Sequence, residues 1–244
     1  MADLSDRQIQ ILKTVIEEYI ETAEPVGSET LDKKYNLGVS PATIRNEMVK
    51  LTELGYLKQL HTSAGRTPTP TAMRYYVDHL MQKQQLSVAE EVAVKEKIWD
   101  HRNELDKLLR EATKTLASRT KTLAITTTDE GDVYYAGAAH ILDMSEFYDI
   151  DLTKTILTLL DQFEYWQDIL EKTTENREEC NVFLGKELGQ AFFEPFGGVF
   201  ARFRLPQSHQ GSIGIVGPAR LNYPYVIPVV RYVGDLLDDM VGKW

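Results

Sequence analysis

The residues with the clearest capacity for chemistry lie in segment 38–66, GVSPATIRNEMVKLTELGYLKQLHTSAGR. Short hydrogen-bonding side chains and cations recur there at helical spacing, on the side opposite an apolar stripe: Thr43, Arg45, Asn46 and Lys50. Side chains of these types form hydrogen bonds to base edges and phosphates in the major groove of DNA. The pattern therefore predicts a surface that can enter the major groove of a duplex.

A second polar cluster follows on a predicted turn. His61, Thr62, Ser63 and Arg66 supply an imidazole, hydroxyls and a guanidinium beside Gly65. These groups suit contact with phosphates or with the minor groove. An ordinary capped helix and hairpin with solvated polar faces would have a similar composition, so the interpretation depends on the surrounding elements.

Segment 38–66 contains its own start and stop signals. Ser40 is placed as an N-cap, Pro41 takes the first helical position, and Gly55 suits the left-handed residue that ends a helix. Ser40 also belongs to the candidate DNA-contacting set. After the helix, residues 56–60 and 67–69 are expected to pair as the strands of a hairpin.

Two helices are expected before this segment. Ser5 and Gln8 have the spacing of a capping box, and Ser28 is expected to cap a short second helix that runs through Tyr35. The order helix, helix, polar helix, hairpin is that of a winged helix-turn-helix, in which the third helix reads DNA. The two lysines at 33–34 either touch phosphates or are simply solvated.

The chain after the hairpin predicts a domain boundary and then a long helix. A helix is expected over 70–85, and the polar stretch 82–85 marks the boundary. Ser87 and Glu90 form a second capping-box pattern, which opens a helix to about Ser118. Its apolar residues recur near heptad positions, so it is either a coiled-coil seam between subunits or a helix packed on its own domain.

The remaining segments predict a sheet with helices. Strands are expected at 121–128, 133–136, 181–184, 198–205 and 212–216, and helices over 151–171, capped by Asp151, and 224–240. The run Gly211–Gly217 lacks the lysine of a phosphate loop and is interpreted as a strand with close backbone packing. The fold class is α+β, with a winged helix-turn-helix domain over 1–86 and a mixed α/β domain over 87–244.

The charge distribution agrees with a local nucleic-acid surface. The net charge is −10, which by itself disfavours binding to a polyanion. Residues 1–86 are nearly neutral, with ten Lys/Arg against eleven Asp/Glu, and segment 33–76 contains seven Lys/Arg against two Asp/Glu. A local basic region on an acidic protein favours selective DNA binding over a general nucleic-acid coat.

Several function classes lack support in the sequence. The single cysteine, Cys180, excludes an intramolecular disulfide and cysteine-based zinc clusters, and the five histidines are scattered without ligand spacing. No nucleophile motif is present, and hydrophobic runs are too short for a membrane span. We therefore expect a cytoplasmic protein that is not an enzyme and that has no cofactor, metal or membrane partner.

Several motifs resemble a known family. EPVGSETL, GVSPATIRNEM, LTELGYL, HTSAGRTPT and RYYVDHL resemble the N-terminal domain of HrcA, the bacterial heat-inducible transcription repressor family, and GSIGIVGPARLNYPYVIPVV resembles its closing motif. The resemblance implies a GAF-like second domain and a homodimer that binds an inverted-repeat DNA operator before chaperone genes. It also implies the chaperonin GroEL as a partner in folding.

The resemblance weakens between Thr128 and Tyr134. Family members carry a large inserted domain there that helps them dimerise, whereas this chain has a turn of a few residues. The helix from Ser87 is therefore an alternative dimer contact. A different function, small-molecule sensing through the GAF-like domain, also remains open at this point.

Overall fold

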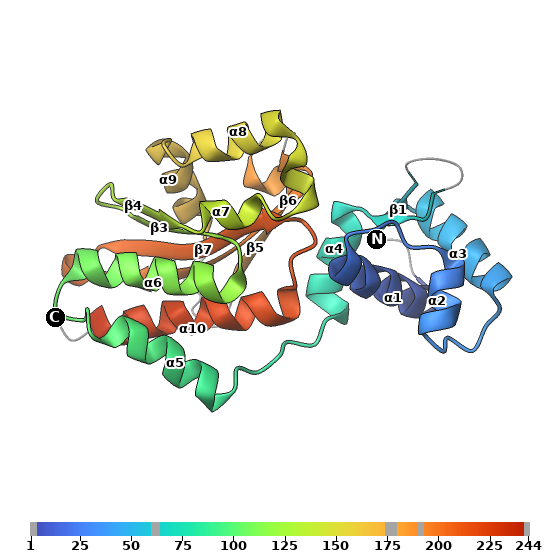
Figure 1. Ribbon diagram of the computed structural model, residues 1–244, viewed down its shortest axis with the longest axis horizontal. Helices are drawn as coiled ribbons and strands as arrows, with labels where there is room; N and C mark the ends of the chain where they lie inside the picture. Colours follow the sequence, from blue (N-terminus) through green and yellow to red (C-terminus); the bar gives the residue numbers. More distant parts are fainter. Residues whose placement is uncertain (1–3, 60–63, 174–179, 190–192, 242–244) are drawn as a thin grey trace. The chain divides into compact units, whose positions relative to one another are not determined.

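The computed structural model describes residues 4–59, 64–173, 180–189 and 193–241. The chain divides into two compact units, residues 1–82 and 83–244, and the division lies inside the polar stretch 82–85 (Figure 1). Helices and antiparallel strands occur together, which confirms the α+β class.

The first unit consists of helices and one short hairpin. In chain order its described elements are α1 (Asp6–Thr22), α2 (Ser28–Lys34), α3 (Pro41–Glu53), β1 (Leu57–Lys58), β2 (Thr67–Pro68), α4 (Pro70–Tyr75) and the π-helix η1 (Tyr76–Leu80). β1 and β2 pair antiparallel, with Leu57 opposite Pro68. Apolar residues of α1, α2, α3 and α4 form its core, including Leu12, Leu31, Ile44 and Met73.

Local capping signals in this unit are mostly confirmed. Ser5 and Gln8 form both hydrogen bonds of the capping box, and the hydroxyl of Ser40 accepts from the N–H of Thr43. Gly55 has φ of +80°, the left-handed value expected at the end of α3. The prediction for Ser28 is wrong: α2 begins at Ser28 itself, after Gly27, which provides no side chain to cap the helix.

The helix predicted over 70–85 is shorter in the structure. α4 changes into η1 at Tyr76, and the N–H of Met81 bonds back to the carbonyl of Tyr76 at 2.9 Å, after which the chain is extended. The polar residues after Met81 have no apolar stripe to bury, so nothing in the sequence favours continuing the helix.

The second unit is built around an antiparallel sheet. In chain order its described elements are α5 (Val88–Trp99), α6 (Leu105–Thr120), β3 (Leu123–Thr128), β4 (Val133–Ala136), α7 (Ala138–Ile141), η2 (Ser145–Tyr148), α8 (Ile150–Leu159), α9 (Phe163–Lys172), β5 (Asn181–Leu184), η3 (Gly185–Leu188), β6 (Phe196–Arg204), η5 (Pro206–Ser208), β7 (Gln210–Pro218) and α10 (Tyr223–Val241). Its described strands have the order β4-β3-β7-β6-β5.

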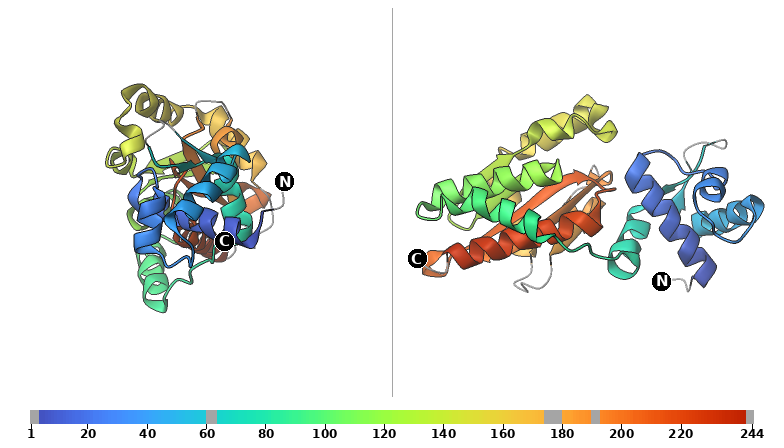
Figure 2. Two further views of the ribbon diagram at one scale, coloured as in Figure 1. Left: turned by 90° about the vertical axis from the view of Figure 1, so that its right-hand side faces the viewer. Right: turned by 60° about the horizontal axis from the view of Figure 1, so that its bottom comes forward.

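Helices cover both faces of this sheet. α6 and α10 lie on one face, and α7, α8 and α9 lie on the other (Figure 1). α5 packs outside α6 and α10, and the right-hand view of Figure 2 shows these three helices side by side. Beneath α7 to α9, residues from these helices and from the sheet form one apolar cluster that includes Ile125, Ile141, Ile156, Trp166 and Phe200.

The long helix predicted from Ser87 to Ser118 is wrong. The capping box of Ser87 and Glu90 is present, but α5 ends at Trp99 and the chain turns before α6 begins at Leu105. The turn lets both apolar stripes pack within one unit, and the heptad-spaced residues of α6 (Leu108, Leu109, Ala112 and Leu116) are at most 1% exposed there. These side chains are packed on their own domain and do not form a seam between subunits.

The helix predicted over 151–171 is also two helices. Asp149, and not Asp151, caps α8 by accepting from the N–H groups of Asp151 and Leu152. The indole N–H of Trp166 donates to the carbonyl of Leu159 at 2.8 Å, which satisfies one of the carbonyls left free where α8 ends. The apolar residues keep their helical spacing across this break, so the sequence pattern alone predicted one helix.

The glycines in segment 211–217 pack closely in β7, as expected. A Cβ at Gly214 would meet the ring of Phe200 and the carbonyl oxygen of Val199 on the neighbouring strand β6. The segment is therefore a strand whose glycines make room for aromatic side chains.

Candidate nucleic-acid interface

The exposed side of α3 contains the predicted contact residues. Ile44, Met48 and Leu51 face the core and are at most 1% exposed. At 100° per residue, the contact residues follow one another around the helix in the order Arg45, Asn46, Lys50 and Thr43. Arg45, Asn46 and Lys50 are all exposed, and Thr43 is partly buried.

A cleft of about 680 Å³ lies beside Arg45 and Asn46. The start of α2, the Arg45 side of α3 and the hairpin together form its walls. Its lining residues are Val26, Gly27, Ser28, Glu29, Thr30, Pro41, Ala42, Arg45, Asn46, Val49, Gln59, Ala64, Gly65 and Arg66. The structure thus brings Arg45, Asn46 and Arg66 to one site.

Arg66 is fixed in this cleft by its backbone and its side chain. Its N–H donates to the carbonyl of Val26 at 2.8 Å, and its carbonyl accepts from the N–H of Val26 at 2.9 Å. Its Nε donates to the hydroxyl of Thr52 on α3 at 2.9 Å. Arg66 is therefore held against both α3 and the segment that precedes α2, and it is not a free side chain at the hairpin tip.

The two arginines of the cleft affect one another. Partial burial lowers the pKa of Arg66 below its usual range, and the positive charge of Arg45 lowers this pKa further. The guanidinium remains charged at physiological pH because its pKa is intrinsically very high. Two cations that repel across a cleft provide a favourable place for an anionic group such as a phosphate.

Gly65 is required for this arrangement. A Cβ at this position would lie 2.6 Å from the carbonyl carbon and oxygen of Val26 and 2.7 Å from the carbonyl carbon of Pro25. These are backbone atoms, which cannot rotate away as a side chain can. The hairpin can approach the segment before α2 this closely only with glycine at position 65.

Other predicted contact residues lie outside the cleft lining. Lys50 forms an ion pair with Glu47 at 3.0 Å, and Glu47 also accepts from the side-chain amide of Gln8 at 3.2 Å. The hydroxyls of Ser40 and Thr43 lie 3.0 Å apart in a hydrogen bond at the start of α3. His61, Thr62 and Ser63 lie outside the described residues.

Lys34 is engaged within the first unit. Its Nζ lies 2.8 Å from Glu18 and 2.7 Å from Glu21, both on α1, and the hydroxyl of Tyr35 donates to Glu18 at 2.7 Å. The hydrogen bond from Lys34 lowers the pKa of Glu18, and burial raises the pKa of Tyr35 to about 12. Lys34 is therefore ion-paired to α1 and is not simply solvated.

Sequence reasoning missed the part of the cleft supplied by α2. Ser28, Glu29 and Thr30 line it, and Glu29 is an exposed carboxylate in a site whose other charged residues are Arg45 and Arg66. Gln59 lines it from the hairpin and donates from its side-chain amide to the carbonyl of Ala64 at 2.8 Å. The polar SET start of α2 was a usable signal, but only packing places it opposite Arg45.

The described part of the chain contains neither a metal-binding cluster nor a membrane-spanning helix. In those residues, no group of three or more His, Cys, Asp or Glu side chains is placed to hold a metal ion. No helix among them is long and apolar enough to cross a membrane.

Comparison with known proteins gives consistent matches. The model of the family described as HrcA protein C terminal domain matches residues 46–227. A heat-inducible transcription repressor HrcA from Symbiobacterium thermophilum is 29% identical over 339 positions, covering 97% of this chain and 98% of that protein. A protein of the same name from Clostridium acetobutylicum is 28% identical, covering 99% and 98%.

One of these relatives contains residues that this chain lacks, and one solved structure has the same fold. The 339 aligned positions exceed the 244 residues of this chain, so the relative from Symbiobacterium contains residues that this chain lacks. A crystal structure of a hypothetical protein at 2.2 Å resolution has the same fold, with a TM-score of 0.78, 19% identity and 99% coverage of both chains. Because the family model matches most of its length, this chain belongs to the HrcA family.

Proposed function

We propose that residues 1–82 form a winged helix-turn-helix that binds duplex DNA, with α3 as the recognition helix and the β1–β2 hairpin as the wing. The observation that carries the proposal is the cleft in which Arg45 and Asn46 of α3 meet Arg66 of the hairpin. A recognition helix in the major groove would place its exposed side against base edges, and the hairpin would lie along the adjacent DNA backbone.

The residues have distinct roles in this proposal. Arg45 suits a bidentate contact with guanine, and Asn46 suits one with adenine. Arg66 lines the cleft and is held by Thr52 through its Nε, so its other N–H groups are left to anchor a phosphate. Thr43 and Lys50 lie farther around α3 from the cleft, where the exposed Lys50 would exchange its ion pair with the buried Glu47 for a phosphate.

We infer that the chain is a repressor of chaperone genes that acts as a homodimer on an inverted-repeat operator. Membership of the HrcA family supports this, since its relatives are named heat-inducible transcription repressors. A two-fold symmetric operator requires two copies related by the same symmetry. With the α6 stripe buried in its own unit, the dimer contact lies elsewhere on the chain.

Equilibrium binding to labelled duplexes tests the DNA-binding proposal. An inverted repeat taken from upstream of a chaperone gene should bind far more tightly than a scrambled duplex of equal length and composition. Arg45→Ala should reduce this difference, whereas Lys13→Ala, on α1 and outside the cleft lining, should leave it unchanged. Equal affinity for both duplexes in the unmodified protein would reject sequence-specific binding.

The heat response needs a separate experiment. We propose that the folded, DNA-competent form is reached with the help of the chaperonin GroEL, since a sheet whose central strands β3 and β7 are distant in sequence folds slowly. The chain should be refolded from denaturant with and without chaperonin and ATP, and operator binding then measured. Full recovery without chaperonin at elevated temperature would show that GroEL is not needed.

A further inference from the structure

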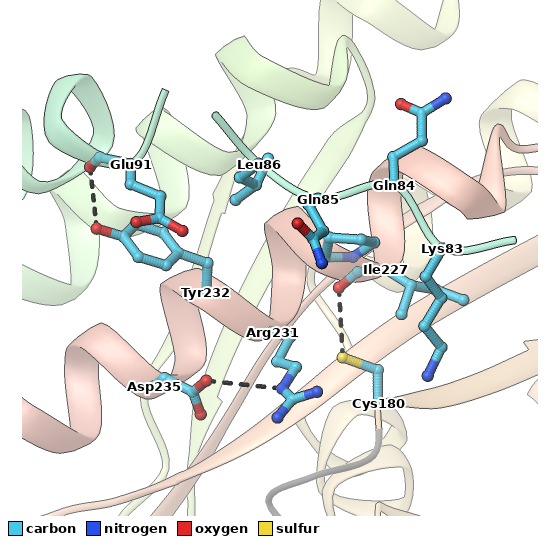
Figure 3. Close-up of a pocket in the computed structure, with 11 residues that line it drawn as sticks. Lys83, Gln84, Gln85, Leu86, Glu91, Cys180, Ile227, Arg231, Tyr232 and Asp235 are labelled. Carbon is cyan, nitrogen blue, oxygen red and sulfur yellow. Dashed lines mark hydrogen bonds and ion pairs between the residues drawn. The ribbon is translucent and has the colours of Figure 1, made fainter. Parts of the chain in front are cut away.

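A cleft in the second unit lies between the chain that enters this unit and its last helix. Its volume is about 430 Å³, which is within the range of small-molecule sites. Residues 83–86 form one wall, Cys180 lies just before β5, and α10 contributes the opposite wall with Ile227, Pro228 and Arg231 (Figure 3).

The wall formed by residues 83–86 is attached to α10 near a proline inside that helix. Pro228 lies inside α10 and has no N–H, so the carbonyl of Pro224 lacks its usual donor within the helix. This carbonyl accepts from the N–H of Gln84 at 2.9 Å. The hydroxyl of Tyr232, one turn after Pro228, donates to the carbonyl of Glu91 at 3.0 Å. The entering chain is thus docked on α10 at two points.

Two cations meet beside the thiol in this cleft. The side chains of Lys83 and Arg231 extend on either side of Cys180 (Figure 3). Arg231 lies 3.7 Å from Asp235, but both side chains are about half exposed, at 45% and 53%, so this pair is weak and exchangeable. Lys83 forms no ion pair with any described residue.

The thiol does not neutralise these cations. Burial raises the pKa of Cys180 to about 12, against the opposite effects of Arg231 and Lys83. Cys180 therefore stays protonated at physiological pH, and its Sγ lies 3.6 Å from the carbonyl oxygen of Ile227, to which it donates. A neutral thiol between two cations leaves room for an external anion.

We propose that this cleft binds a small molecule through a carboxylate or phosphate group held between Lys83 and Arg231, with its apolar part against Ile227 and Pro228. A bound molecule would hold residues 83–86 on α10. Because residues 83–86 continue directly from the first unit, occupancy of the cleft would regulate DNA binding by that unit. The regulatory step rests on the proposed function, whereas the binding site does not.

Cys180 is the one cysteine in the sequence, so its rate of modification reports on the cleft alone. The full chain should be treated with N-ethylmaleimide, which is uncharged, in sodium phosphate, acetate or chloride at equal ionic strength. An anion present at ten times its dissociation constant should slow the modification about tenfold. Protection by phosphate, acetate or both relative to chloride supports the site and identifies the group it prefers. Equal rates in all three salts would overturn it.

Matched variants separate the site from a general effect of salt. Lys83→Gln and Arg231→Gln should remove the protection, whereas Lys97→Gln, an exposed lysine of α5 outside the cleft lining, should retain it. Unchanged protection in both cleft variants would contradict the assignment. Far-UV circular dichroism and melting curves establish that each variant is folded before its labelling rate is compared.

Hydrogen exchange at the Gln84 amide tests the effect on residues 83–86 without DNA. If the anion holds this segment on α10, exchange at Gln84 should slow in the protecting salt by the same factor as the labelling rate. Slowed labelling with unchanged exchange would remove the regulatory step and leave the binding site. Since neither measurement involves DNA, a failure of the proposed function would not alter either result.

Discussion

Replacing Gly65 with alanine should separate the hairpin from the segment that precedes α2. The added Cβ would lie 2.6 Å from the backbone of Val26, so the hairpin has to move. The two hydrogen bonds between Val26 and Arg66, at 2.8 and 2.9 Å, then lengthen or break. Each such bond contributes about 0.5–1.5 kcal/mol, so we expect a loss of about 1–3 kcal/mol in the free energy of unfolding of the first unit.

The same displacement should weaken DNA binding. Arg66 follows Gly65 directly, and its side chain reaches Thr52 only from its present position. We therefore expect Gly65→Ala to reduce affinity for every duplex at least as much as Arg66→Ala does. In a unit of this size, each kcal/mol lost should lower the melting temperature by about 4–8 °C.

Gly27→Ala is the matched control for this experiment. Gly27 lines the same cleft, but a Cβ there would meet only the hydroxyl of Thr30, at 3.8 Å, which is an ordinary contact. Urea unfolding followed by circular dichroism, together with binding isotherms on one operator duplex, should be measured for both variants. If Gly65→Ala is as stable and binds DNA as tightly as Gly27→Ala, the proposal that Gly65 sets the position of the hairpin is wrong.

Three further outcomes are expected. Arg45→Ala should reduce the free energy of operator binding by about 1–3 kcal/mol and relax the base preference at one operator position. Arg66→Ala should instead weaken binding to all duplexes alike and flatten the salt dependence of the affinity. Binding isotherms on mutated operators at several salt concentrations decide between these outcomes. Thr52→Val, which keeps the shape but loses the acceptor for Arg66 Nε, should mimic part of the Arg66→Ala effect with little loss of stability, and unchanged binding would show that this hydrogen bond does not position Arg66. The pKa of Glu18 is lowered in the fold by the hydrogen bond from Lys34, so its contribution to stability is present above its unfolded pKa of about 4.3 and is lost as pH falls through the folded value. Glu18→Gln should therefore show a smaller loss of stability on acidification, measured by urea unfolding between neutral and acidic pH, and an unchanged slope would contradict this cause.

Much of the first unit could be predicted from short-range patterns. The caps at Ser5 and Ser40 and the left-handed Gly55 were all found from residue types a few positions apart. The same reasoning failed for Ser28, because Gly27 already has the extended backbone of an N-cap, and the helix begins one residue earlier than a serine cap would allow.

Helical periodicity was a weaker guide in the second unit. The helix that the apolar repeat extends to Ser118 ends at Trp99, whose carbonyl accepts from the backbone N–H of Arg102 at 3.2 Å and from the Arg102 side chain at 2.9 Å. α5 and α6 can both bury their stripes in one unit only if the chain turns there. A pattern of single residues contains no information about whether two stripes face the same core.

The candidate interface shows the same division. Residue types alone identified Arg45, Asn46 and Arg66, and their role in DNA binding stays a prediction. The sequence could not show that Thr52 holds Arg66, or that α2 supplies Glu29 to the same cleft.

The sequence by itself determined where most helices of the first unit begin and end and which residue types face solvent on α3, because an N-cap bond joins residues three apart and a left-handed glycine is an intrinsic preference. Only the tertiary structure decided which polar side chains share a site. The Nε of Arg66 bonds to a hydroxyl 14 residues away, and Glu18 on α1 binds Lys34 at the end of α2. Such contacts depend on how helices and hairpin pack against one core, and this packing is fixed by the apolar side chains of the whole unit and not by the polar residues that it brings together.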